Sequence, residues 1–298
     1  MTLRTSGESS KNPGTQYING TIDIATDDKL LNIVSVHFTY VTAKTAKGNA
    51  NATFDTLQNI INGVLKNVTE HGADVAAKLR IDSSIGLNEF YSNRSGADEL
   101  VSIKRNEGGF VHVTQAIAGD ETLRDTFKCD MIITGMRRIE ADEEHGRPER
   151  GVVKGYIFDF RKALLPVEFT ALSKGAIDYF EGLEASDRNP CFTQVWGHQL
   201  SQTVVTRKVT ESAFGEASVE ETTSTQRDFV ITGSISEPYA WDDESSITAQ
   251  EFKTALSDRE VAVAAIKQRQ DEYRASQNAN AATANNVTTP ATASGFNF

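Results

Sequence analysis

The sequence predicts a mainly β fold with α elements (α+β), whose strands form a barrel or a sandwich. Many short segments are rich in β-branched and aromatic residues, several of them alternate apolar with polar residues, and few segments have helical spacing. The chain has 298 residues, which is long enough for one large domain or two small ones. Whether the chain forms one barrel or two stays open at this point.

Composition narrows the class of protein. A hydrophobic content of 39% and a charged content of 24% are typical of a soluble globular protein. No apolar run approaches the roughly 18 residues of a membrane span, and the polar N-terminus predicts no secretion. Cys129 and Cys191 lie too far apart for a metal or redox spacing, which favours a reducing, cytoplasmic compartment.

The net charge of −11 counts against general electrostatic binding of nucleic acid. Any nucleic-acid site must therefore be a local groove of Lys and Arg side chains. Acidic residues dominate the body of the chain as well as its C-terminal part.

The N-terminal part begins with residues 1–16, which are predicted to be flexible because they are rich in Ser, Thr, Gly and Asn. A strand-rich region begins near Tyr17, and residues 31–41 alternate as a half-buried strand does. Residues 51–78 have helical spacing and predict an amphipathic helix packed on the sheet. Gly63 weakens the middle of that helix by roughly 1 kcal/mol relative to Ala.

A β-hairpin is predicted next. Residues 75–81 are interpreted as a strand and residues 86–91 as a turn. Residues 100–105 and 110–114 then form two strands, because the intervening Asn106-Glu107-Gly108-Gly109 supplies the glycines that a tight turn needs.

The second half of the body is also rich in strands. Residues 127–135 predict a strand, residues 137–150 an exposed charged loop, and residues 176–183 a short helix. Further strands are predicted at 192–200 (interrupted by Gly197), 202–209 and 227–233. The fragment Ile132-Ile133-Thr134-Gly135 is echoed by Val230-Ile231-Thr232-Gly233, which is compatible with two similar β units.

The segment Gly151–Lys162 carries the most informative pattern. As a strand it would place Tyr156, Phe158 and Phe160 on one face, between Lys154 and Lys162. Aromatic rings flanked by cations are typical of a stacking platform for single-stranded nucleic acid. The alternative is that this face packs into a core.

Sequence motifs for catalysis are lacking. We find no glycine-rich phosphate loop, metal-binding Cys/His spacing or nucleophile elbow, and the five histidines are scattered. Asp142, Glu143 and Glu144 precede His145 in a charged loop, which more often forms a solvated surface than a metal site. The sequence therefore predicts a protein that is not an enzyme and has neither a cofactor nor a metal.

The C-terminal part has two sections. Residues 237–275 are predicted to be an acidic segment and a long helix, and Thr248 with Glu251 fits a capping box at its start. Residues 276–298 are almost entirely Ala, Asn and Thr, and predict a disordered tail that ends in an aromatic tip, Phe296 and Phe298.

Two runs carry a resemblance to a known family. Residues 189–221 (NPCFTQVWGHQLSQTVVTRKVTESAFGEASVEE) and 237–252 (EPYAWDDESSITAQEF) resemble bacteriophage single-stranded DNA-binding proteins, and the similarity extends over residues 127–274. The resemblance implies an OB-like β-barrel body, here residues 17–236, with no cofactor, in the cytoplasm of an infected bacterium. The tip resembles the hydrophobic tip of bacterial single-stranded DNA-binding proteins but lacks the acids that precede it there.

These observations predict a single-stranded DNA-binding protein that coats DNA during phage replication and recombination. The tail would recruit phage or host replication and recombination proteins, and the sequence leaves open a homo-oligomer. The alternatives are a virion structural or assembly protein (a tail or capsid component), and an acidic mimic of DNA. Base-stacking and phosphate-binding residues are expected to be Lys154, Tyr156, Phe158, Phe160, Arg161, Lys162, Trp196, Arg207 and Lys208.

Overall fold

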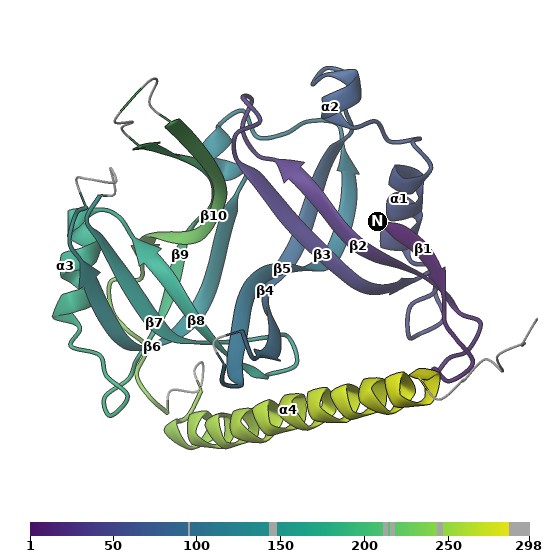
Figure 1. Cartoon of the computed structure of the whole chain (residues 1–298). Coiled ribbons are helices and arrows are strands. Elements are labelled where there is room, and N and C mark those ends of the chain that lie inside the picture. Colours follow the sequence, from purple (N-terminus) through teal and green to yellow (C-terminus); the bar gives the residue numbers. More distant parts are fainter. Residues whose placement is uncertain (95, 143–147, 211–213, 215–217, 243–246, 286–298) are drawn as a thin grey trace, which may run out of the picture.

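The chain folds into two β units and a long C-terminal helix (Figure 1). The computed structural model describes residues 1–94, 96–142, 148–210, 214, 218–242 and 247–285. The N-terminal unit is a five-stranded sheet of spatial order β1-β2-β3-β5-β4, made of β1 (Thr2–Thr5), β2 (Gln16–Ala25), β3 (Ile33–Thr42), β4 (Lys78–Ser92) and β5 (Glu99–Thr114).

The C-terminal unit is a closed barrel of spatial order β10-β8-β7-β6-β9. Its strands are β6 (Thr126–Ile139), β7 (Arg150–Phe158), β8 (Leu164–Ala171), β9 (Cys191–Thr210) and β10 (Ser218–Ser234). The helices are α1 (Ala52–Ile61), α2 (Val68–His71), the 3-10 helix η1 (Glu121–Leu123), α3 (Lys174–Gly182) and α4 (Ala249–Asn285). The expected mainly β fold, with few helices and a closed barrel, is confirmed.

The two units share one strand arrangement. Numbered within each unit, the strands follow the order 1-2-3-5-4, with the third and fifth strands parallel and the other neighbouring pairs antiparallel. A helix lies between the third and fourth strands of each unit, α1 in the first and α3 in the second. The units differ in closure, because only the second joins its first strand to its fourth, through β6 and β9.

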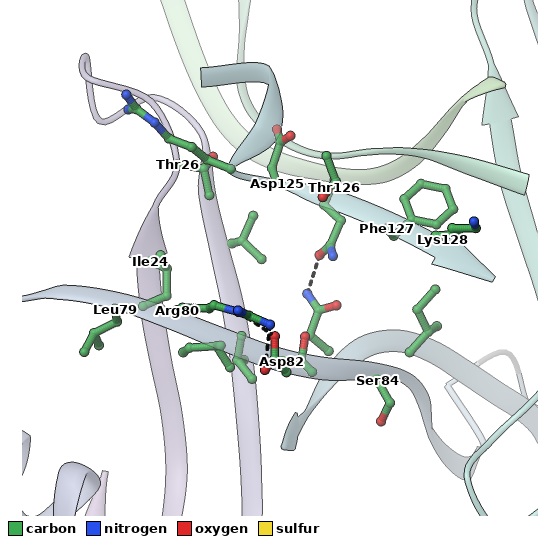
Figure 2. Close-up of a pocket in the computed structure, with 18 of the residues that line it drawn as sticks. Ile24, Thr26, Leu79, Arg80, Asp82, Ser84, Asp125, Thr126, Phe127 and Lys128 are labelled. Carbon is green, nitrogen blue, oxygen red and sulfur yellow. Dashed lines mark hydrogen bonds and ion pairs between the residues drawn. The ribbon is translucent and has the colours of Figure 1, made fainter. Parts of the chain in front are cut away.

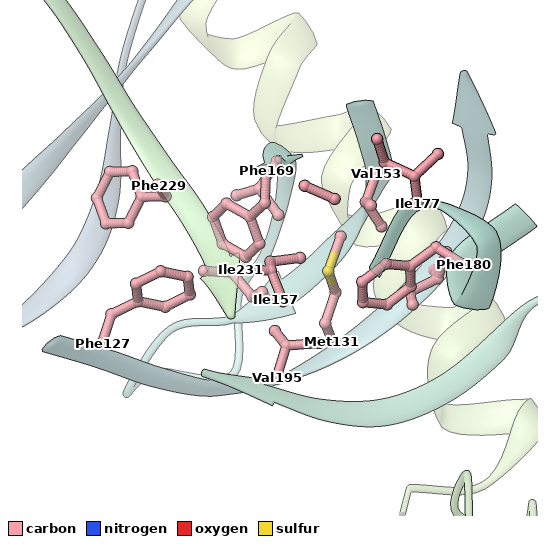
Figure 3. Packing of buried hydrophobic residues seen from close by; sticks show 13 residues of the cluster. Phe127, Met131, Val153, Ile157, Phe169, Ile177, Phe180, Val195, Phe229 and Ile231 are labelled. Atoms are coloured by element: carbon pink, nitrogen blue, oxygen red, sulfur yellow. The ribbon is translucent and has the colours of Figure 1, made fainter. Parts of the chain in front are cut away.

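The barrel core consists of side chains that point inward from every strand (Figure 3). The rings of Phe127, Phe169 and Phe229 lie 5.2 to 5.7 Å apart between centroids. Ile177 and Phe180 of α3 close one end of this core. Each large apolar side chain buried in this way stabilises the fold by about 1.5–3 kcal/mol.

The echoed tetrapeptides lie in one barrel, so they do not mark a repeat of the two units. The β6–β7 register shifts between Ile133 and Gly135, and the β9–β10 register shifts between Ile231 and Gly233. Such bulges bend a strand and increase its twist, which a small closed barrel requires. The echo therefore reflects a shared bend.

The predicted hairpin at residues 100–114 is wrong, because β5 is one continuous strand. A Cβ at Gly108 would lie 2.2 Å from the ring of Phe38, and a Cβ at Gly109 would lie 1.8 Å from the carbonyl oxygen of Asp82. These glycines permit close packing and do not form a turn. The predicted turn at residues 86–91 is wrong for a related reason, since β4 runs unbroken through it to pair with β5.

Gly197 also lies within a continuous strand. β9 extends over 20 residues, and a Cβ at Gly197 would lie 1.9 Å from the carbonyl oxygen of Val230. The expected interruption is therefore a close approach of two backbones.

Two boundaries near the N-terminus differ from expectation. Residues 2–5 form β1, which pairs with β2, so this part of the predicted flexible segment is ordered by the sheet. The helix expected over residues 51–78 ends at Ile61, because Gly63 adopts a left-handed φ of 69° that terminates it.

The long helix α4 lies along one side of both units (Figure 1). Its predicted capping box is confirmed: the Thr248 N–H donates to Glu251 Oε2 at 2.8 Å, and the Glu251 N–H donates to Thr248 Oγ1 at 3.1 Å. The helix continues to Asn285, beyond the predicted boundary at residue 275. Residues 286–298, with Phe296 and Phe298, lie outside the described part of the chain.

Candidate nucleic-acid interface

The predicted platform strand is β7, and its two faces are those that the alternation indicates. Val153 and Ile157 point into the barrel, whereas Lys154, Tyr156 and Phe158 lie on its outer side. The aromatic face is therefore not part of the barrel core.

The strand is shorter than predicted, because it ends at Phe158. The Asp159 carboxylate accepts hydrogen bonds from the backbone N–H groups of Arg161 (2.8 Å) and Ala163 (2.7 Å), which forms a turn. Lys162 completes the turn with a left-handed φ of 64°. Phe160, Arg161 and Lys162 thus lie in a turn and do not extend the strand, contrary to expectation.

Tyr156 is covered by the C-terminal segment. Its ring lies 5.8 Å from that of Phe252 in α4, and Trp241 stacks on Phe252 at 6.0 Å. Beneath them, Ile132 and Phe192 are buried on the outer side of β6 and β9. Tyr156 is therefore a packing residue of a second core, and its expected role in base stacking does not fit this arrangement.

The C-terminal segment, with Tyr239, Trp241 and Phe252, covers only part of the outer face of the barrel. The β6–β9 register places Ile132 opposite Phe192 under the cover, and Lys128 opposite Trp196 beyond it. Between these two rows, Asp130 accepts hydrogen bonds from Gln194 Nε2 (2.9 Å) and the Tyr239 hydroxyl (3.2 Å). The covered row is apolar, and the uncovered row combines a cation with an indole.

Phe160 lines the same cleft as Lys128. Its side chain is 76% exposed, and the Arg161 guanidinium lies 5.0 Å from its ring centroid. Phe158, Phe160 and Lys128 all line one cleft between the two units. We call Phe160, Lys128 and Trp196 the open row.

The Trp196 ring packs against Gly233 of β10. Its side chain is 38% exposed, and a Cβ at Gly233 would lie 2.3 Å from its Nε1 atom. The absence of a side chain at Gly233 lets the indole lie flat over β10, which leaves its outer side accessible.

The cleft beside the open row has a volume of about 740 Å³. In Figure 2, β4 with Leu79, Arg80 and Asp82 faces the start of β6 with Phe127 and Lys128. The cleft is lined by residues of both units, since Ile24 of β2 contributes as well.

Two arginines of the cleft are already in ion pairs. Arg80 Nε lies 3.0 Å from Asp82, and Arg124 Nη1 lies 2.6 Å from Asp28. Hydrogen bonding to Arg124 and its positive charge lower the pKa of Asp28, so this pair is ionised at neutral pH. The cleft therefore does not offer a continuous basic groove from these residues.

Hydrogen bonds between the units fix the geometry of the cleft. Asn106 Nδ2 donates to Gln199 Oε1 at 2.6 Å, and Asn32 Nδ2 donates to Asp125 Oδ2 at 2.8 Å. His198 Nδ1 lies 2.7 Å from the other oxygen of Asp125. These contacts join β5 to β9, and they join the residue before β3 to the residue before β6, which also contacts β9.

Other predicted cations lie away from the open row. Lys154 is exposed on β7, but the β7–β8 register places it opposite Glu168. Arg207 lies opposite Glu221 in β9–β10, and Lys208 lies opposite Glu220. Arg207 is 11 residues beyond Trp196 along β9, a path of about 36 Å along the strand at 3.3 Å per residue. The side chains of Arg207 and Lys208 lie outside the described part of the structure.

Lys128 is the residue of the open row that sequence reasoning missed. The segment Phe127–Gly135 predicts a strand, and within it Phe127, Cys129 and Met131 alternate with Lys128 and Asp130. That alternation already indicates that Lys128 points outward. Its proximity to Trp196 depends on strand pairing across 68 residues, which the sequence does not reveal.

Two findings concern reactive thiols and metal binding in the described part of the chain. Burial raises the pKa of the Cys129 thiol to about 12, and burial also raises that of Cys191, so both are protonated at neutral pH. Among the described residues no group of three or more His, Cys, Asp or Glu side chains could hold a metal ion. His145, with Glu143 and Glu144, falls outside those residues. Within the same part of the chain, no helix is long and apolar enough to cross a membrane.

The protein has two β units with the same strand order, and aromatic and cationic side chains line the cleft between them. The chain matches the YorF family model over residues 3–270 and belongs to that family. Neither the curated proteins nor the solved structures include a match to the chain.

Proposed function

We propose that the protein is a non-enzymatic single-stranded DNA-binding protein of a bacteriophage, and that DNA crosses the open row. Each unit has five strands in one Greek-key order with a helix after the third strand, an arrangement that supports an OB-like assignment. OB-like barrels bind oligonucleotides on their outer strands and adjoining loops. In this proposal the protein works in the cytoplasm of the infected host, with replication or recombination proteins as partners.

The observation that carries the proposal is that Lys128 is close to Trp196 across the strand pair and shares a cleft with Phe160. Lys128 lies opposite Trp196 in the β6–β9 register and lines the same cleft as Phe160. Aromatic rings stack on bases with about 1–3 kcal/mol per base, and a cation near them meets a phosphate. Arg161, stacked on Phe160, adds a second cation at the edge of the row.

The charge distribution sets the expected strength and salt dependence of binding. The protein carries −11 overall, and the two cleft arginines are paired, so few phosphates are neutralised. For one or two phosphates on a single strand, the slope of log K against log salt is about −0.7 to −1.4. Stacking therefore contributes more to the affinity than charge does.

The proposal is tested by fluorescence anisotropy of a labelled oligo-dT strand, titrated with the full chain at two salt concentrations. We expect saturable binding that weakens modestly with salt and that duplex DNA does not compete away, because paired bases cannot stack on the row. No binding at low salt would overturn the proposal.

A virion assembly role is the second candidate function. It is favoured by residues 78–85 of β4, which within the described residues pair only with β5, since a free strand edge readily pairs with another polypeptide chain. Recovery of the protein in purified particles, together with failure to bind oligo-dT, would support this role over the first.

A further inference from the structure

The first strands of the two units differ in a way that leaves one edge open. In the C-terminal barrel, β6 pairs with β9 over Thr126–Ile133 and with β7 over Ile132–Ile139. In the N-terminal unit, β1 has four residues and pairs only with β2. Within the described residues, β4 therefore has β5 as its one neighbouring strand.

The far half of the β4 edge is covered by α4. The Tyr91 N–H donates to Gln270 Oε1 at 2.7 Å, and Gln270 Nε2 donates back to the Tyr91 carbonyl, so one side chain imitates a neighbouring strand. Arg259 of α4 forms an ion pair with Glu89, and both side chains are nearly buried. This half of the edge is protected in the way that natural sheets protect their edges.

The near half of the edge, residues 78–85, faces the cleft. Leu79, Ile81 and Ile85 line it from β4, and Ile24 and Val34 line it from β2 and β3. Leu79 and Ile81 remain only half-buried, although they pack against the core of their unit. In the closed barrel the corresponding space is filled by the inward side chains of β6, among them Phe127, Met131 and Ile133.

We propose that this edge binds an extended segment of a partner polypeptide, which completes the N-terminal unit as β6 completes the barrel. The segment would run antiparallel to β4 over about eight residues, the length of the β6–β9 pairing. Its backbone would pair with residues 78–85, and alternate apolar side chains would enter the cleft. This inference goes beyond the proposed function and does not rest on it.

Charge favours a polypeptide over a nucleic acid at this edge. Arg80 and Arg124, the arginines beside it, are occupied by Asp82 and Asp28. Asp82 also lies on the edge itself. A phosphate backbone would meet these acids, whereas a strand of neutral and apolar residues would meet hydrogen-bonding groups and apolar side chains.

The test is hydrogen exchange of the full chain with a synthetic peptide that copies residues 126–133, with serine in place of Cys129. We expect amide exchange over residues 78–85 to slow by about tenfold or more at saturating peptide. The matched control is a peptide of the same composition whose apolar positions are shifted by one residue, because that shift turns its apolar side chains outward. Equal protection by both peptides would overturn the proposal.

A fusion protein tests the same edge if the free peptide binds weakly. The same eight residues are fused before Met1 through a short flexible linker, which raises their effective concentration to the millimolar range. Protection of residues 78–85 in the fusion, and none in the shifted fusion, is the expected result. No protection in either fusion would overturn the proposal, and so would protection of the same amides by oligo-dT. Trp196 fluorescence reports DNA binding at the open row separately.

Discussion

Phe160 is the residue that most directly separates binding from stability. It is 76% exposed, so Phe160→Ala should change the free energy of unfolding by less than about 0.5 kcal/mol. If its ring stacks on a base, the same change should weaken oligo-dT binding by about 5- to 150-fold, the equivalent of 1–3 kcal/mol. Anisotropy titrations and urea unfolding measure the two effects.

The matched control for Phe160 is Tyr273→Ala, which removes a ring that is 63% exposed on α4. This variant should bind oligo-dT as the unaltered protein does. If both changes weakened oligo-dT binding equally, exposed rings would contribute without regard to position. That result would contradict DNA binding at the open row.

Lys128 should control the salt dependence. Lys128→Gln keeps a polar side chain, shorter by one atom, but removes one cation, so the slope of log K against log salt should become shallower by about 0.7. Lys47→Gln removes another exposed cation, from a turn of the N-terminal unit, and should leave the slope unchanged. A slope that falls equally in both variants would indicate a diffuse charge effect.

At the scale of single elements, the docking of α4 should depend on pH. Burial alone would raise the pKa of Glu89, but hydrogen bonds from Arg259 and Ser102 outweigh it and lower that pKa below its usual value. The ionised carboxylate thus stabilises the fold above the unfolded pKa of about 4.3, and this contribution is lost as the pH falls through the folded pKa.

Glu89→Gln isolates this contribution, because the amide cannot titrate. Thermal unfolding should show a lower Tm for the variant than for the unaltered protein at pH 7, and a smaller difference at pH 3. A difference in Tm that is the same at both pH values would mean that the ion pair does not stabilise the docked helix.

Local elements could be predicted from the sequence when neighbouring residues decide them. The capping box at Thr248, the helix at α3 and the alternation of β3 and β7 all depend on spacing within a few residues. Gly108 and Gly109 of β5 wrongly predict a turn. They instead allow close contact with Phe38 and β4, which lie far away in the sequence. Glycine indicates either a turn or a close approach, and only the tertiary structure distinguishes them.

At the scale of the whole molecule, the candidate site depends on contacts that no local pattern contains. The alternation predicts that Lys154, Tyr156 and Phe158 share one face of β7, and they do, but Phe252, which covers Tyr156, is 96 residues away in the chain. Lys128 and Trp196 are also far apart in the sequence, so no local pattern predicts their pairing. The sequence therefore indicates the residue types of the candidate interface, and the fold decides which of them remain accessible.

Tyr156 tests whether the covered half of the face is a core. It packs against Phe252 in the cluster that joins the barrel to α4, so Tyr156→Ala should destabilise the protein by about 2–4 kcal/mol. The comparison is Phe160→Ala, which lies four residues away and should cost little stability. Chemical denaturation of both variants measures the difference. If Tyr156→Ala left stability unchanged but abolished DNA binding, the covered face would be the stacking platform after all.

The most direct measurement uses the two tryptophans of the chain. Trp241 lies in the second core with Tyr156 and Phe252. Trp241→Phe therefore leaves Trp196 of the open row as the one fluorescent indole. Titration of this variant with oligo-dT should quench its emission saturably, since a base stacked on the indole quenches it, and the reverse variant Trp196→Phe should show little quenching. Unchanged emission from Trp196 while labelled oligo-dT binds the same variant would contradict DNA binding at the open row.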